Sequence, residues 1–213
     1  MSLPRKQFDA QRIASLVIQH DDDPIDPRRD YDNMGVMACW HRRGSYGDDR
    51  ENKFRHTPAS EWLEPWGTRG LNSQAWLASL PKGTIVLPLF MMDHSGVTIR
   101  TSCGSFQACD PQGWDWGQLG VIVATPAAIR NNFGVKRITK KIRERAEKVL
   151  QSEVETYDLC LTGQCWGYVI TDAEGEEDAC WGFFGDTLES TGLKDALPDA
   201  AIPLLEEAWA ARK

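Results

Sequence analysis

The stretch from Ile85 to Ala124 limits the fold more than any other part of this 213-residue chain. It contains three short apolar runs, 85–92, 97–102 and 119–124, which are rich in Val, Ile and Leu and are separated by Gly, Asp and Ser. Branched side chains suit the pleated surface of a sheet, whereas Gly, Asp and Ser favour turns. The stretch therefore predicts three strands in a central meander, the first two forming an antiparallel hairpin through Asp93–Gly96.

Helical patterns follow this stretch. Thr125 and Pro126 predict the start of a short helix, because Thr caps free backbone amides and Pro is tolerated at the first helical position. Gly134 is expected to end that helix, since a positive φ is cheap for Gly. From Lys140 to Leu161, after the cap Thr139, apolar residues recur every three or four positions and predict one long helix. A second hairpin is expected over 165–171 and 178–185, and a last helix over about 203–211.

Strands first, then helices, then a hairpin and a helix are typical of the α+β class. We expect a mostly antiparallel sheet, made of the central meander and the C-terminal hairpin and packed by one long helix and shorter helices. We interpret 1–213 as a single α+β domain, with a sub-boundary near 125–139 and a C-terminal linker and helix at 186–213. The pattern at 13–18 fits a strand as well as a short helix, and 58–80 has helical spacing.

Charge is distributed unevenly along the chain, whose net charge is −7. Residues 21–32 are acidic and contain Pro24 and Pro27, so no regular element is expected there. Residues 136–148 are basic. The start of this basic segment could bind phosphates, or it could be a solvated helix face, and the overall acidity opposes general nucleic-acid binding. The candidate binding residues here are Lys136, Arg137, Lys140 and Lys141.

The longest apolar run, 85–92, is too short to cross a bilayer and contains Pro88. No apolar segment of the signal-peptide type follows the N-terminus. We therefore expect a cytoplasmic protein without membrane contact. Six cysteines in an intracellular chain of this size argue against a disulfide framework.

Cys39 and His41 are the closest pair of candidate metal ligands. They fall in an alternating segment, 34–41, that predicts a strand with both side chains on one face. A metal site needs three or four ligands, and no second close pair of ligands is present in the sequence. We expect a half-buried strand with a hydrogen-bonded histidine, and no bound metal or cofactor.

Two sets of residues in the central stretch are candidates for function. Asp93 and His94 could act as orienter and base for a nucleophile at Cys103 or Ser102, or with Asp115 in a metal-dependent enzyme, although Asp-x-Ser-Gly is also ordinary turn chemistry. In the loop that ends at 114–118, two tryptophans lie beside polar residues. Either both rings fold over the sheet, or one ring is the centre of a binding site, flanked by polar groups that give specificity. The candidate residues of this loop are Trp114, Asp115, Trp116 and Gln118.

Several blocks of the chain resemble a group of uncharacterised small proteins encoded by bacteriophages and other mobile elements. The resemblance covers about 26–185 and includes 26–28, 93–96, 114–120, 134–138 and 180–185. It implies a phage or plasmid context, and it implies no mechanism.

Taken together, these features favour a non-enzymatic accessory protein that binds a host protein, for example to inhibit an anti-phage defence such as restriction or CRISPR. The alternative is a small metal-dependent or nucleic-acid-processing enzyme that uses Asp93, His94 and Asp115. The sequence leaves the oligomeric state open.

Overall fold

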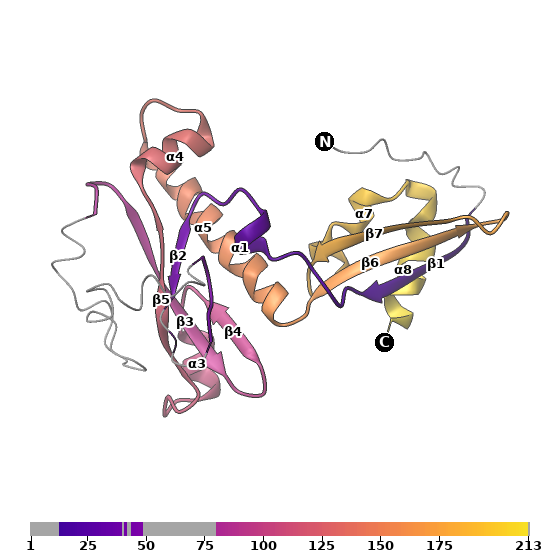
Figure 1. Ribbon diagram of the computed structural model, residues 1–213, viewed down its shortest axis with the longest axis horizontal. Coiled ribbons are helices and arrows are strands. Elements are labelled where there is room, and N and C mark those ends of the chain that lie inside the picture. The colour runs from indigo at the N-terminus through magenta and orange to yellow at the C-terminus, as the bar shows by residue number, and fades with distance from the viewer. Residues whose placement is uncertain (1–12, 40, 42–43, 49–79, 213) are drawn as a thin grey trace. The chain divides into compact units, whose positions relative to one another are not determined.

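The computed structural model describes residues 13–39, 41, 44–48 and 80–212 (Figure 1). The chain forms two compact units. Unit 1 consists of residues 1–25 and 163–213, and unit 2 of residues 26–162. The helices expected at 58–80 lie almost entirely outside the described residues. Whether the two units unfold together, as a single domain would, stays a prediction.

Unit 2 holds an antiparallel sheet with the strand order β2-β5-β3-β4. β3 (Ile85–Asp93) and β4 (Val97–Arg100) form the predicted hairpin. β5 (Trp116–Ala124) pairs with β3 rather than with β4, so the three strands are not in meander order. The chain reaches the far side of β3 through α3 (Gly104–Cys109) and the loop after it. β2 (Val36–Cys39) completes the sheet and is shorter than the strand expected at 34–41.

The long helix α5 (Lys140–Leu161) has the predicted bounds and the predicted cap, since Thr139 Oγ1 accepts a hydrogen bond from the amide of Ile142. Its apolar face packs in one core with β3, β4 and β5. A helix with apolar residues along one face is stabilised when other elements cover that face. α4 (Pro126–Phe133) also begins at a capping threonine, Thr125, and ends at Gly134 with φ +62°. The buried residues of the α5 stripe are Ala146, Leu150, Val154 and Tyr157.

A buried arginine ties three segments of unit 2 together. Arg28 lies in α1 (Pro27–Asp30), a short helix in the segment for which the sequence predicted no regular element. That prediction was wrong because Asp26 caps the helix through the amide of Arg28 and Pro27 occupies its first turn, where a missing N–H is harmless. The guanidinium donates to both carboxylate oxygens of Asp48, at 2.7 and 2.8 Å, and to Glu153 of α5 at 3.0 Å.

Unit 1 holds a second antiparallel sheet with the order β1-β6-β7. The segment 13–18, for which the sequence allowed a strand or a short helix, is part of the strand β1 (Ile13–His20). β6 (Cys165–Asp172) and β7 (Glu177–Phe184) are the predicted second hairpin. The core of this unit lies between β1, β6 and the C-terminal helices, which are α6 (Leu188–Thr191), α7 (Leu193–Ala196), the 3-10 turn Asp199–Ala201 and α8 (Ile202–Ala211).

The two antiparallel sheets, packed by helices that include the long α5, confirm the α+β class. The sequence predicted a single mostly antiparallel sheet, whereas the C-terminal hairpin pairs with β1 in a sheet of its own.

Candidate functional site

The predicted residues Asp93, His94 and Asp115 meet at one end of the unit 2 sheet. β3 and β5 are antiparallel with Met92 opposite Trp116, so the end of β3 lies beside the residue before β5. The amide of Asp93 donates to the carbonyl of Asp115 at 2.8 Å. The His94 ring contacts the Asp115 carboxylate, with 2.7 Å between Nδ1 and Oδ2. Two segments separated by about twenty residues of sequence thus form one small polar site.

The loop before β5 is fixed by Asp110. Its carboxylate accepts hydrogen bonds from the amides of Gly113 (3.1 Å) and Asp115 (2.9 Å), and its carbonyl accepts one from the Trp116 indole (2.8 Å). The amide of Asp115, followed by other loop amides, holds the pKa of Asp110 below its usual value, since these hydrogen bonds favour the ionised form. The loop therefore presents its side chains in a defined orientation.

The two tryptophans of this segment differ in burial. Trp116 is 8% exposed, and its ring makes an edge contact with Phe90 of β3. Trp114 is 79% exposed, and its indole N–H donates to Gln112 within the loop. The interpretation in which both rings fold over the sheet is therefore wrong, because only Trp116 does so. That the Trp114 ring is the centre of a binding site stays a prediction. Gln118 is buried inside β5 and does not belong to the exposed surface.

The exposed residues of the site are Asp93, His94 and Trp114, and the Asp115 side chain is 42% exposed. The His94 side chain is 70% exposed, so its ring is open to water and to other molecules. A histidine held by a carboxylate is the base half of a nucleophilic catalytic group, which also needs a hydroxyl or thiol at the other ring nitrogen. No hydroxyl or thiol of the described residues hydrogen-bonds to His94. Among the described residues, this surface therefore combines an exposed aromatic ring with a hydrogen-bonded His–Asp pair.

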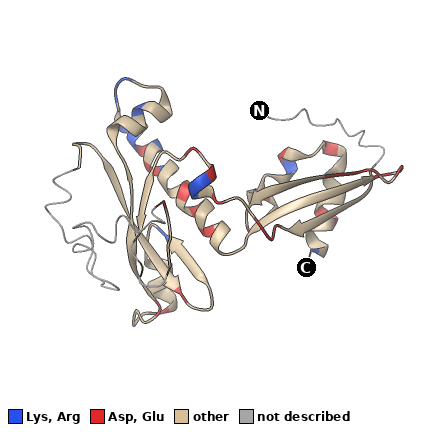
Figure 2. Cartoon of the chain, viewed as in Figure 1, with Lys and Arg blue, Asp and Glu red and all other residues tan. Residues whose placement is uncertain are grey.

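The predicted basic residues lie elsewhere. Figure 2 shows positive charge gathered at the start of α5, where all four predicted cations are exposed. Trp114 lies just before β5, whereas the basic residues follow α4, which comes after the other end of β5. A nine-residue strand such as β5 spans about 30 Å. The structure therefore does not join the basic residues to the Trp114 site. One of the four, Lys140, pairs loosely with Glu144 at 3.9 Å, as is typical of a solvated helix face.

Cys39 and His41 do not form a metal site with other described residues, among which no group of three His, Cys, Asp or Glu ligands converges. Cys39 is buried in the core at the end of β2. His41 lies beyond that strand, and its Nδ1 accepts a hydrogen bond from the amide of Gly44 at 3.0 Å.

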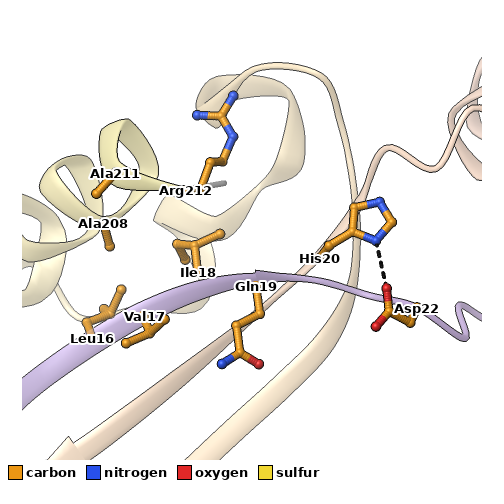
Figure 3. A pocket seen from close by; sticks show the side chains of 9 residues that line it. All are labelled: Leu16, Val17, Ile18, Gln19, His20, Asp22, Ala208, Ala211 and Arg212. Carbon is orange, nitrogen blue, oxygen red and sulfur yellow. Dashed lines mark hydrogen bonds and ion pairs between the residues drawn. The ribbon is translucent and has the colours of Figure 1, made fainter.

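A hollow in unit 1 was not foreseen from the sequence. A pocket of about 520 Å³ lies between β1 and the last turn of α8. Figure 3 shows the side chains that line it. His20 lies at its rim, bonded to Asp22 and to the carbonyl of Gly163. Arg212 stacks on the Trp209 ring at 3.6 Å from its centroid. The sequence could not predict this pocket, because its walls come from β1 and α8, which are far apart in the chain.

Comparison with protein-family models, with curated proteins and with solved structures found no match to this chain. Within the described residues, every helix is too short or too polar to pass through a bilayer.

Proposed function

We propose that this chain is a binding protein that docks on another protein through the Trp114 loop. The observation that carries the proposal is a large aromatic ring, 79% exposed, on a loop that Asp110 holds in one conformation. Exposed tryptophans are costly in water and are enriched at the centres of protein interfaces. A loop that is already ordered also loses little entropy on binding.

The residues around Trp114 suit the rim of such an interface. His94 and Asp115 offer a donor and an acceptor that fix the orientation of a partner, while Trp114 supplies buried apolar area. Trp116 and Gln118 support the loop from within the fold. Following the phage resemblance, we propose that the partner is a protein of the bacterial host cytoplasm and that binding inhibits a defence system.

A site-specific crosslink tests this proposal. A photoreactive phenylalanine analogue replaces Trp114 in host cells, and the same analogue at Gln107, an exposed residue of α3, serves as the matched control. A single crosslinked partner at position 114 and none at position 107 is the expected result. The partner is then purified, and its affinity is measured by calorimetry for the parent, Trp114→Ala and Trp181→Ala proteins.

Trp181 is the other exposed tryptophan of the described residues, and it belongs to unit 1. We expect Trp114→Ala to weaken binding by about 2 kcal/mol or more, as loss of a hot-spot residue does. Trp181→Ala should leave the affinity unchanged. Loss of binding in Trp181→Ala with full binding in Trp114→Ala would place the interface in unit 1 and refute the proposal.

The second candidate function is a small metal-dependent or nucleic-acid-processing enzyme, and the 2.7 Å contact between His94 and Asp115 favours it. A divalent cation would need further oxygen or nitrogen ligands from the substrate or from water. Incubation of the purified protein with DNA and RNA, with and without Mg²⁺ or Mn²⁺, tests this function. Turnover that is lost in His94→Ala and Asp115→Ala would establish it.

A further inference from the structure

β1 is an edge strand, and in the described part of the chain it pairs only with β6. Beyond its end, the amide of Asp21 donates to the carbonyl of the residue opposite, Cys165, at 2.9 Å. Hydrogen-bonded and non-hydrogen-bonded pairs alternate along an antiparallel ladder. In this register, the amides and carbonyls of Val17 and Gln19 hydrogen-bond to β6. Those of Leu16, Ile18 and His20 point away from β6, to the outer edge of the sheet.

The 520 Å³ pocket runs along this edge. It is lined by five consecutive residues of β1, Leu16–His20, and by Ala208, Ala211 and Arg212 near the C-terminal end of α8 (Figure 3). Successive side chains of a strand point to opposite faces, so a pocket that contacts five in a row follows the strand edge rather than one face. An exposed edge beside a helix is the geometry in which an extended peptide adds to a sheet as one more strand.

A second pocket, of about 490 Å³, continues the first and shares Gln19, His20 and Asp22 with it. Its other walls include Asp21, Asp23, Ile25 and Trp181. The Trp181 ring, 45% exposed, lies so close to β6 that a Cβ at Gly167 would be 2.1 Å from it. An indole face beside carboxylates holds the aliphatic stem and the charged end of a Lys or Arg side chain.

The charge of unit 1 favours the same kind of partner. Residues 1–25 and 163–213 contain six Lys and Arg against fifteen Asp and Glu, a net charge of −9. Unit 2 contains the other eighteen Lys and Arg and sixteen Asp and Glu, a net charge of +2. An acidic surface around the groove attracts basic segments and repels acidic ones.

We propose that the outer edge of β1 binds an extended, basic peptide segment of another protein as an added strand, with a Lys or Arg side chain between Trp181 and Asp21–Asp23. The backbone hydrogen bonds come from Leu16, Ile18 and His20. This surface is in unit 1 and shares no residue with the Trp114 site, so it is a separate interface.

A synthetic peptide of alternating Thr and Val with an Arg at each end is the probe, and its affinity is measured by calorimetry. Two matched peptides accompany it. One carries Glu in place of both Arg residues, and the other is N-methylated at every Thr and Val, which removes the donors of a strand. We expect the Arg peptide to bind and each matched peptide to bind at least about ten-fold more weakly.

Paired protein variants locate the binding. Ala211→Trp fills the groove, whereas Ala210→Trp, at an exposed neighbour that does not line the pocket, leaves it open. Asp23→Lys and Glu207→Lys change the net charge equally, but only Asp23 lines the second pocket. Ala211→Trp and Asp23→Lys should each weaken binding by about ten-fold or more, and their partners should retain it.

Amide hydrogen exchange, measured by NMR, distinguishes strand addition from binding by charge alone, because only strand addition forms hydrogen bonds with the outer amides of β1. On peptide binding, the amides of Leu16, Ile18 and His20 should exchange more slowly, and those of Val17 and Gln19 should keep their rates. Failure of all peptides to bind at millimolar concentration would overturn the proposal, as would equal binding of the N-methylated peptide. A dimer of the chain that Ala211→Trp dissociates would also overturn it, because the edge would then bind a second copy.

Discussion

Replacement of Arg28 tests whether its buried ion network holds unit 2 together. The Arg28 side chain is fully buried and connects α1 to Asp48 and to Glu153 of α5. Its Nη2 also donates to the carbonyl of Gly35 at 2.7 Å. Burial by itself would lower the pKa of Arg28, but Asp48 and Glu153 outweigh it and hold the pKa above its usual value, so the guanidinium stays charged.

The magnitude follows from what Arg28→Ala leaves behind. Removing one partner of a buried ion pair costs about 3–5 kcal/mol, because the remaining charge loses its compensation. Water reaches Asp48, whose side chain is 24% exposed, more easily than Glu153, which is 11% exposed. Both carboxylates also keep backbone donors, from Met37 to Asp48 and from Met34 to Glu153. We therefore expect a loss near the lower end of that range, about 3–4 kcal/mol.

Urea denaturation at neutral pH, followed by fluorescence and circular dichroism, measures this loss. Arg28→Lys keeps the charge but not the two-pronged contact with Asp48, so it should cost about half as much as Arg28→Ala. Arg29→Ala is the matched control, since Arg29 is exposed and its closest carboxylate, on Asp26, is 3.8 Å away. A loss in Arg28→Ala no larger than that in Arg29→Ala would refute the reasoning.

Three further predictions concern single side chains. Trp116→Ala should cost about 3–5 kcal/mol in urea denaturation, as for a buried aromatic, whereas Trp114→Ala should change stability by less than about 0.5 kcal/mol. Equal losses would contradict the difference in burial between the two rings. Gly96→Val should lower stability by about 1–3 kcal/mol, because Gly96 has φ +151°, and an unchanged melting temperature would count against this. Burial raises the pKa of Asp158, and this effect is larger than the lowering by the hydrogen bond from Ile99 and by the charge of Arg100. The folded state therefore binds more protons at Asp158 than the unfolded state does. The contribution of Asp158 to stability falls as pH rises above about 4. Asp158→Asn keeps an acceptor for Ile99 and should gain stability relative to the parent as pH rises from about 4 to 7; a pH-independent difference between the two proteins would argue against this.

Local signals in the sequence predicted α5 and the two hairpins, but not the short helices α1 and α3. The bounds of α5 follow from its cap, Thr139, and from the spacing of its apolar residues, because both act within a few residues of each other. The hairpin through Asp93–Gly96 and the hairpin of β6 and β7 were predicted for the same reason. Both hairpins and the helix are formed by residues that are close together in the sequence, so a local sequence pattern is enough to predict them.

Only the tertiary structure decided how these elements meet. Trp114 and Trp116 have the same side chain, but Trp116 is the first residue of β5 and packs against Phe90 of β3, whereas Trp114 lies in the preceding loop and is exposed. Arg28 lies in an acidic segment that looked solvated, yet Asp48 and Glu153, twenty and 125 residues away, make its burial possible. The groove beside β1 likewise needs α8, from the other end of the chain. Such sites depend on contacts between distant segments, which no local pattern of residues specifies.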